Sequence, residues 1–217
     1  MRARMALKLA DIAVEIREIS LRDKPVHMLQ VSPKGTVPVL ILADGSVIDE
    51  SLEVMIWAFN NAREESDVLI ANALGHFLSN SFHELDSPCV HAAYKASSQR
   101  ILTAQSDNEF KKHLDCYKYP ERHREKTQQA YRQLGEIFLT QLENLLQHNR
   151  YLFGEKPSFA DYAIFPFIRQ FAAVDSAWFD GSSLEGAPYP KLCTWLNGWV
   201  NSALFTSIMQ KQPIFIQ

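Results

Sequence analysis

Hydrophobic patterning changes near residue 63, and this change constrains the fold more than any other feature of the sequence. Residues 1–63 mix short helical patterns with strand patterns, whereas residues 67–217 carry apolar side chains at the three- and four-residue spacing of helices. The helical spacing is clearest over 121–148. The sequence therefore predicts a small α/β domain over 1–63 followed by an all-α, helical-bundle domain over 67–217.

Five local patterns predict the elements of the first domain. An amphipathic helix is expected at 1–13, and the β-branched but charged segment VEIREISL that follows suits an edge strand. A short helix is expected over 25–32, because proline starts it and a Pro-x-Gly sequence follows it. Two apolar runs around an Ala-Asp-Gly turn predict a hairpin over 37–49, and a helical pattern returns from Ser51.

Composition and charge exclude several classes of protein. The chain has 22 Lys and Arg against 25 Asp and Glu, a net charge of −3, whereas electrostatic binding of nucleic acid needs a concentrated positive field. No apolar run approaches the ~20 residues of a membrane helix, and the N-terminus lacks the apolar segment of a signal peptide. Three widely spaced cysteines do not make a disulfide framework. We therefore expect a cytoplasmic protein with no nucleic-acid or membrane partner.

Two groups of reactive residue types are better explained by structure than by chemistry. Ser158 and Asp161 precede an apolar run with the Ser-x-x-Asp spacing of a helix cap, so we expect them to stabilise a helix start rather than to catalyse. Histidines and cysteines show no zinc-ligand spacing, and core or surface roles are expected for His76, His83, Cys89, His91, His113 and Cys116. No metal site is predicted.

Two short motifs of the first domain have the features of binding sites. Pro38 at the start of a strand removes a ladder donor and holds Val37 extended, so the main chain of Val37 can pair with an extended peptide. A strand-entry proline without a ligand is the alternative. Glu50 and Ser51 stand where a helix begins, and the N–H groups of a helix start bind carboxylates. Alternatively, Ser51 caps its own helix, and both roles can hold at once.

Five motifs together resemble those of the glutathione S-transferase superfamily, with a bacterial, omega-like pattern over nearly the whole chain. They are Leu21-Arg22-Asp23-Lys24-Pro25, Thr36-Val37-Pro38-Val39-Leu40, Asp49-Glu50-Ser51, the 113–120 stretch HLDCYKYP, and Gly154 through Ser158 to Asp161. The resemblance implies a thioredoxin-like domain followed by a helical domain. It also implies a glutathione-dependent transferase or thiol transferase, with glutathione as cosubstrate and an electrophile or disulfide as second substrate. A homodimer is implied as well.

The resemblance also implies roles for individual residues. The Val37–Pro38 bond is expected to be cis and to grip the cysteinyl residue of glutathione. Glu50 would take the γ-glutamyl ammonium, Ser51 the γ-glutamyl carboxylate, and Lys24 the glycyl carboxylate, although a solvated surface lysine is an equal alternative for Lys24. Second-substrate roles are implied for Tyr117, Lys118 and Tyr119, for which ordinary packing is the favoured alternative.

The sequence departs from the family at its first residue. Family members begin with a strand and a turn carrying a catalytic Cys, Ser or Tyr, whereas this sequence opens inside the helix that follows, at MRARMAL. Without that strand, a gap of roughly 9.6 Å would separate the edge strand from the hairpin. We therefore expect the reactive residue upstream of Met1 and no catalytic residue in the chain. Arg2 and Arg4 are expected to be solvated helix charges, with a contribution of positive potential near the missing turn as the alternative. A noncatalytic glutathione-fold binding or scaffolding module is the alternative function.

Overall fold

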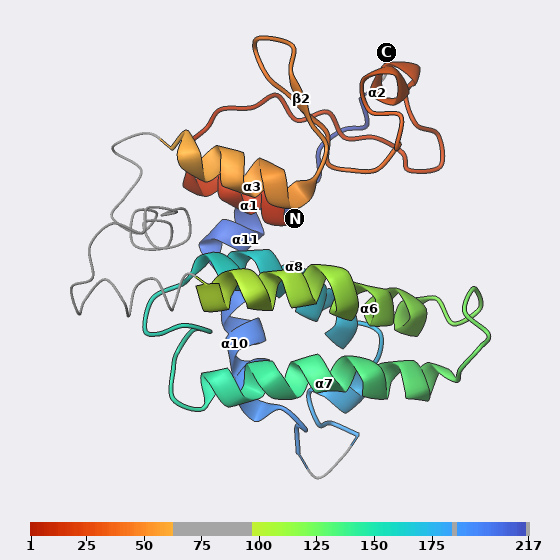
Figure 1. The fold of residues 1–217 in the computed structure, drawn as a ribbon, viewed down its shortest axis with the longest axis vertical. Helices are drawn as coiled ribbons and strands as arrows, with labels where there is room; N and C mark the ends of the chain where they lie inside the picture. Colours follow the sequence, from red (N-terminus) through yellow and green to blue (C-terminus); the bar gives the residue numbers. More distant parts are fainter. Residues whose placement is uncertain (63–96, 184–185, 216–217) are drawn as a thin grey trace. The chain divides into compact units, whose positions relative to one another are not determined.

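The computed structural model describes every residue except 63–96, 184–185 and 216–217, and it divides into two compact units (Figure 1). One unit contains the described residues of Met1–Ile70 and Ser202–Gln217, and the other contains those of Ala71–Asn201. The last 16 residues therefore group with the N-terminal unit, although the sequence pattern placed them in a helical domain over 67–217. The reason is packing, because the helix that begins this segment contacts the first helix of the chain.

Three helices form the core of the first unit. Helix α1 (Arg2–Leu9) packs against α3 (Ser51–Asn60), and α11 (Ala203–Ile208) packs against α1, as Figure 1 shows. Small and flexible side chains of α1 and α3 are fully buried. They are Met5, Ala6, Met55 and Ala58. Alanine allows close approach of the two backbones, and methionine fills the remaining gaps.

The hairpin predicted over 37–49 is present. Strand β1 (Leu40–Ile41) pairs antiparallel with β2 (Val47–Ile48), and Gly45 in the turn has a φ of +84°, a conformation that glycine adopts without steric cost. The carboxylate of Asp44 stabilises the turn by accepting hydrogen bonds from the N–H and the hydroxyl of Ser46. A short helix, α2 (Val26–Val31), precedes the hairpin, as expected.

The segment VEIREISL does not form the edge strand expected of it. Within the described residues the sheet contains only β1 and β2, and this segment makes a single parallel bridge, between Glu18 and Ile214. The N–H of Phe215 donates to the carbonyl of Glu18 at 2.7 Å, and the guanidinium of Arg17 lies 4.8 Å from the centre of the Phe215 ring. The extended backbone thus pairs with the C-terminal segment, a long-range partner that local patterning does not reveal.

The regular secondary structure in the described part of the second unit is helical, as the sequence predicts, apart from one bridge between Tyr151 and Gly154. Residues 97–105 are helical, and the following elements are the π-helical turn η1 (Ser106–Phe110), α6 (Lys111–Lys118), α7 (Gln128–Leu146), α8 (Phe159–Ala172), α9 (Ser176–Phe179) and α10 (Pro190–Val200). Helix α7 begins later than the pattern over 121–148 suggests, because the hydroxyl of Thr127 caps it by accepting from the N–H of Ala130. No helix in the described ranges is long and apolar enough to span a membrane.

The capping role expected for Ser158 and Asp161 is confirmed. The Asp161 side chain is fully buried at the start of α8, and its Oδ2 accepts from both the N–H and the hydroxyl of Ser158. Its Oδ1 accepts from the N–H of Leu152 at 3.0 Å and from the indole of Trp195 at 2.8 Å. This carboxylate joins three segments of the second unit and has no surface open to a substrate.

Candidate functional site

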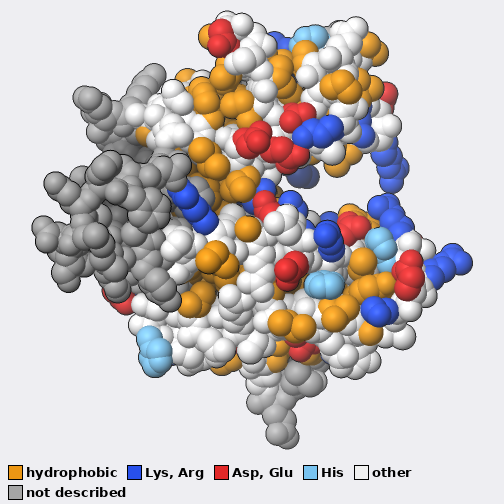
Figure 2. Space-filling view, viewed as in Figure 1, with side chains coloured by type: hydrophobic (Ala, Val, Ile, Leu, Met, Phe, Trp, Pro, Cys, Tyr) orange, Lys and Arg blue, Asp and Glu red, His pale blue; other side chains and the backbone are white. Residues whose placement is uncertain are grey.

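The main chain of Val37 is open at the entrance to the hairpin. The Val37–Pro38 peptide bond is cis, and the side chain of Val37 is 52% exposed. Among the residues that the structure describes, none forms a hydrogen bond with the N–H or the C=O of Val37. Other apolar residues in and around α2 and the hairpin are exposed, among them Leu21, Val26 and Ile41. Figure 2 shows apolar side chains at the surface of the molecule. The surface around Val37 is therefore free to accept an extended peptide.

A buried arginine meets the start of α3. The Nε of Arg2 donates to the Oγ of Ser51 at 2.9 Å, and Arg2 is only 3% exposed. The expectation that Arg2 is a solvated helix charge is therefore wrong, because the packing of α1 on α3 encloses it. Arg4 is partly exposed and pairs with Glu18 at 2.6 Å.

Ser51 does not cap its own helix. Glu50 holds the N-cap position of α3, and no side chain accepts a hydrogen bond there. Since the first N–H groups of a helix carry partial positive charge, they add to the charge of the Arg2 guanidinium. The start of α3 therefore combines N–H groups that have no side-chain cap, the Arg2 guanidinium and a hydroxyl, with the acidic residues Glu50 and Glu53 beside them.

A lysine ties the loop before Val37 to the start of α3. The Nζ of Lys34 lies 2.6 Å from an oxygen of Glu50 and 2.9 Å from an oxygen of Asp49, whose other oxygen accepts from the Ser32 hydroxyl. Hydrogen bonding to Glu50 and Asp49 raises the pKa of Lys34, and the bond from Lys34 lowers the pKa of Asp49. Glu50 still has one oxygen outside this pair and is 57% exposed.

Lys24 approaches the same loop from the segment before α2. Its Cδ and Nζ would lie 3.6 and 3.4 Å from a Cβ added at Gly35, which has a φ of +60°. Glycine allows the left-handed backbone here, and a Cβ at this position would come within 3.1 Å of the Leu29 side chain. Val37 follows two residues later, so Lys24 stands beside the loop that leads to the open main chain.

In the structure Val37, Pro38, Glu50 and Ser51 lie on one loop and one helix start of the first unit, and Lys24 approaches the same loop. Val37 and Pro38 follow the Lys34 loop, and Lys34 fastens that loop to Glu50. Ser51 is linked to Arg2 instead of to the loop. Sequence reasoning missed Lys34 and the burial of Arg2, because both depend on which segments meet in space.

The described cysteines are not activated thiols. Burial, followed by the nearby carboxylates of Asp115 and Glu125, raises the pKa of Cys116. Burial and the carboxylate of Asp180 raise the pKa of Cys193. Both thiols therefore favour the protonated form, which is a poor nucleophile.

The other predicted side chains are accounted for as follows. Within the described ranges, no cluster of three His, Cys, Asp or Glu residues could hold a metal ion. His76, His83, Cys89 and His91 lie outside the described residues. Tyr117 lines a pocket in the second unit, whereas Lys118 donates to Gln170 at 3.3 Å and lies over the ring of Tyr119.

A cis-proline before a hairpin, a helix start beside it, and an all-helical unit with a buried capping carboxylate define a class of protein. The class combines a thioredoxin-like domain with a helical C-terminal domain. Residues 1–66 match the family model described as glutathione S-transferase, N-terminal domain, and residues 106–203 match the one described as glutathione S-transferase, C-terminal domain. The chain belongs to the glutathione S-transferase superfamily.

Individual relatives agree with this assignment. "Probable glutathione S-transferase MSR-1" of Nicotiana plumbaginifolia is 25% identical over 215 residues, which cover 99% of this chain and 86% of the relative. A ternary complex of BphK, a bacterial glutathione S-transferase, has a TM-score of 0.70 at 19% identity and covers 96% of this chain and 92% of its own. A sphingomonad glutathione S-transferase complexed with glutathione has a TM-score of 0.67 at 18% identity, with coverage of 96% and 92%. At these identities the two solved structures show the fold.

Proposed function

We propose that this protein is a glutathione-dependent transferase or thiol transferase that binds glutathione between the start of α3 and the main chain of Val37. The observation that carries the proposal is the buried Arg2 guanidinium, which lies against Ser51 at a helix start without a side-chain cap. The N–H groups of a helix start without a side-chain cap bind an anion, and glutathione presents carboxylates. By family membership we extend the proposal to a cytoplasmic homodimer acting on an electrophile or a disulfide.

Each polar group of glutathione has a partner in this proposal. The γ-glutamyl carboxylate accepts from the first N–H groups of α3 and from the Ser51 hydroxyl, and the ammonium lies against the free oxygen of Glu50. The cysteinyl main chain pairs with the N–H and C=O of Val37, as one strand pairs with another. The glycyl carboxylate is within reach of Lys24, whose ammonium acts as a point charge.

The residues named here bind glutathione and do not react with the second substrate. In the transferase reaction the glutathione thiolate is the nucleophile, and it becomes more abundant near neutral pH when positive potential lowers the thiol pKa. The start of α1 supplies such potential through its helix dipole, because its first turn contains no acidic side chain. In this proposal the described residues bind glutathione and supply the positive potential that lowers the pKa of its thiol.

A noncatalytic glutathione-binding module is the second candidate. The raised pKa values of Cys116 and Cys193 favour it, because neither of these thiols is prepared for disulfide exchange. The two candidates share the same binding site and differ only in turnover.

Retention on glutathione-agarose, measured beside turnover, tests both candidates. Turnover is assayed with a halogenated nitroaromatic electrophile and with a glutathione mixed disulfide. Retention with turnover supports the transferase, and retention without turnover supports the binding module. Ser51→Ala is expected to reduce retention, whereas Ser207→Ala, which removes a hydroxyl that donates to the carbonyl of Leu204 in α11, is the matched control. Absence of retention by a folded protein contradicts both candidates.

A further inference from the structure

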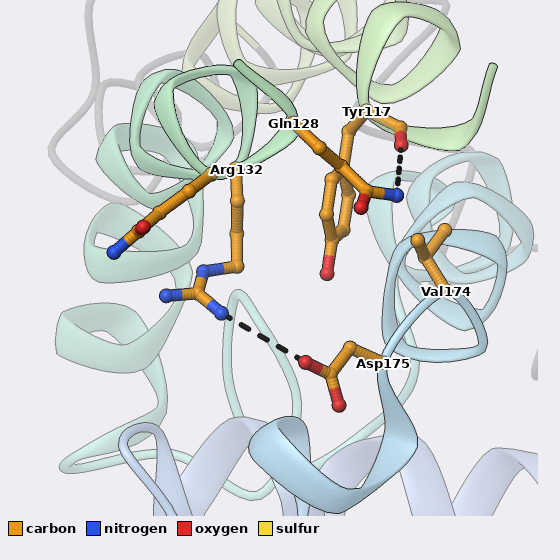
Figure 3. Close-up of a pocket in the computed structure, with 6 residues that line it drawn as sticks. Tyr117, Gln128, Arg132, Val174 and Asp175 are labelled. Carbon is orange, nitrogen blue, oxygen red and sulfur yellow. Dashed lines mark hydrogen bonds and ion pairs between the residues drawn. The ribbon is translucent and has the colours of Figure 1, made fainter. Parts of the chain in front are cut away.

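A polar pocket in the second unit is not used by the proposed glutathione site. It has a volume of about 350 Å³ and lies where the end of α6, the start of α7 and the segment after α8 meet (Figure 3). Its lining consists of Tyr117, Gln128, Gln129, Arg132, Val174 and Asp175. Only Val174 is apolar, so the pocket is unsuited to an apolar ligand.

Arg132 is held in place from two sides. Its Nε donates to a carboxylate oxygen of Glu136 at 3.1 Å, and its guanidinium lies 4.3 Å from the centre of the Trp178 ring. The Arg132 side chain is 19% exposed. These contacts use the Nε and one face of the guanidinium. They leave the terminal nitrogens directed at the pocket, as Figure 3 shows.

Asp175 is held by one hydrogen bond, and its side chain is 45% exposed. Its Oδ1 accepts from the N–H of Trp178 at 3.0 Å and so caps α9. Its Oδ2 faces Arg132 across 3.9 Å, which is longer than a hydrogen bond. The pocket therefore presents a guanidinium that is already paired at its Nε with Glu136, and a carboxylate that lies too far from this guanidinium for a direct hydrogen bond.

Two further features add polarity to the same space. Helix α7 begins at the pocket, and its 19 residues place the positive end of a helix dipole beside Arg132, with no acidic residue in the first turn. The hydroxyl of Tyr117 points into the space between Arg132 and Asp175 (Figure 3). Burial, followed by the negative charge of Asp175, raises the pKa of Tyr117, so its phenol stays protonated at neutral pH.

We propose that this pocket binds a small zwitterion that carries a carboxylate and an ammonium close together, as an α-amino acid does. The carboxylate lies against the terminal nitrogens of Arg132 and the start of α7, and the ammonium lies against Oδ2 of Asp175 and the hydroxyl of Tyr117. A simple anion would meet repulsion from Asp175, and a simple cation would meet repulsion from Arg132. The proposal is independent of glutathione binding, because its residues belong to the second unit alone.

Three probes of similar size test the charge requirement. L-Alanine carries both charges, propionate carries only the carboxylate, and ethylamine carries only the ammonium. Binding of each probe to the purified full chain is measured from chemical-shift titrations at constant ionic strength. We expect L-alanine to bind about tenfold more tightly than either fragment, since a charge-assisted hydrogen bond is worth about that factor. Equal affinities of L-alanine and propionate would overturn the proposal.

The variant Asp175→Asn tests the role of the negative group while keeping the cap of α9, because asparagine also accepts from a helix N–H. The variant is expected to bind L-alanine about tenfold more weakly than the unaltered chain does. Its affinity for propionate is expected to be unchanged or higher. Asp180→Asn is the matched control, since Asp180 makes an equivalent bond to the N–H of Ser182 outside the pocket. Similar behaviour of the two variants would overturn the proposal. If Asp175→Asn does not fold, the relative affinities of the unaltered chain for L-alanine, propionate and ethylamine still test the proposal.

Discussion

The hydrogen bond from Arg2 Nε to Ser51 Oγ, 2.9 Å long, links the first turn of α1 to the first turn of α3. Because Arg2 is buried and Ser51 is only partly exposed, the bond fixes a cation and a hydroxyl at one helix start. The same contact therefore contributes to the stability of the first unit and to the proposed carboxylate site.

Replacing Ser51 with alanine is expected to affect both properties. Loss of the acceptor removes one hydrogen bond from a buried guanidinium, and we expect unfolding free energy to fall by about 1–2 kcal/mol. Glutathione affinity is expected to fall about tenfold for the same reason. Denaturant unfolding and calorimetric titration measure the two effects. Ser51→Thr keeps the hydroxyl and is the control, and equal losses in both variants would contradict the role of the hydroxyl.

Local sequence patterns predict the helices and the hairpin of this fold better than they predict which segments pair with one another. The hairpin follows from apolar runs around Gly45, and α8 follows from the Ser158 and Asp161 spacing, because both signals lie within a few residues. For the segment containing Glu18 the local pattern predicts an edge strand, whereas the structure has only a bridge to Ile214, which joins residues far apart in sequence. No local pattern carries that information.

The candidate site likewise contains residues that a local pattern predicts and residues that only the packing of the chain brings in. Val37 and Pro38 form a local signal, and the structure has the cis bond that the family resemblance implied. Arg2 and Lys34 became part of the site only because α1 packs on α3 and the Lys34 loop turns back to Glu50. From sequence alone a charged side chain in a helix is expected to be solvated, because its burial depends on which element packs against that helix.

Asp161→Ala is expected to destabilise the second unit strongly. The change leaves buried donors of Leu152, Ser158 and Trp195 without their acceptor, and we expect a loss of at least about 2 kcal/mol. Thermal or denaturant unfolding measures the loss. Asp180→Ala removes a carboxylate from an exposed turn and should change stability by less than about 0.5 kcal/mol. Unchanged melting of Asp161→Ala would contradict the capping role.

The pairing of the C-terminal segment with Glu18 predicts a difference between two substitutions of Phe215. Phe215→Ala removes the ring beneath Arg17 but keeps the N–H that donates to the Glu18 carbonyl. Phe215→Pro removes both. We expect the proline variant to be less stable than the alanine variant by about 1 kcal/mol, the net value of one backbone hydrogen bond. Equal midpoints of denaturant unfolding would show that this bond contributes nothing.

Thr103→Val is expected to stabilise the protein. Thr103 is 2% exposed, and its hydroxyl has no hydrogen-bond partner among the residues that the structure describes. Valine has nearly the same shape without the polar group, so the change should gain about 1 kcal/mol. Thr140→Val is the control, because the exposed hydroxyl of Thr140 donates to the Glu136 carbonyl. Destabilisation by Thr103→Val would mean that the hydroxyl is satisfied, for example by an internal water.

The two described thiols are expected to react slowly at neutral pH. Burial and nearby carboxylates raise the pKa of both Cys116 and Cys193, so the thiolate fraction of each is smaller than that of an unperturbed cysteine and grows only as pH rises through the elevated pKa. Alkylation by iodoacetamide, followed at each peptide by mass spectrometry from pH 7 to 10, should be slow at pH 7 and rise steeply above pH 9. Unfolding in urea should remove the difference from free cysteine. Fast alkylation of either folded thiol at pH 7 would instead reveal an activated nucleophile and would weaken the case for the binding module.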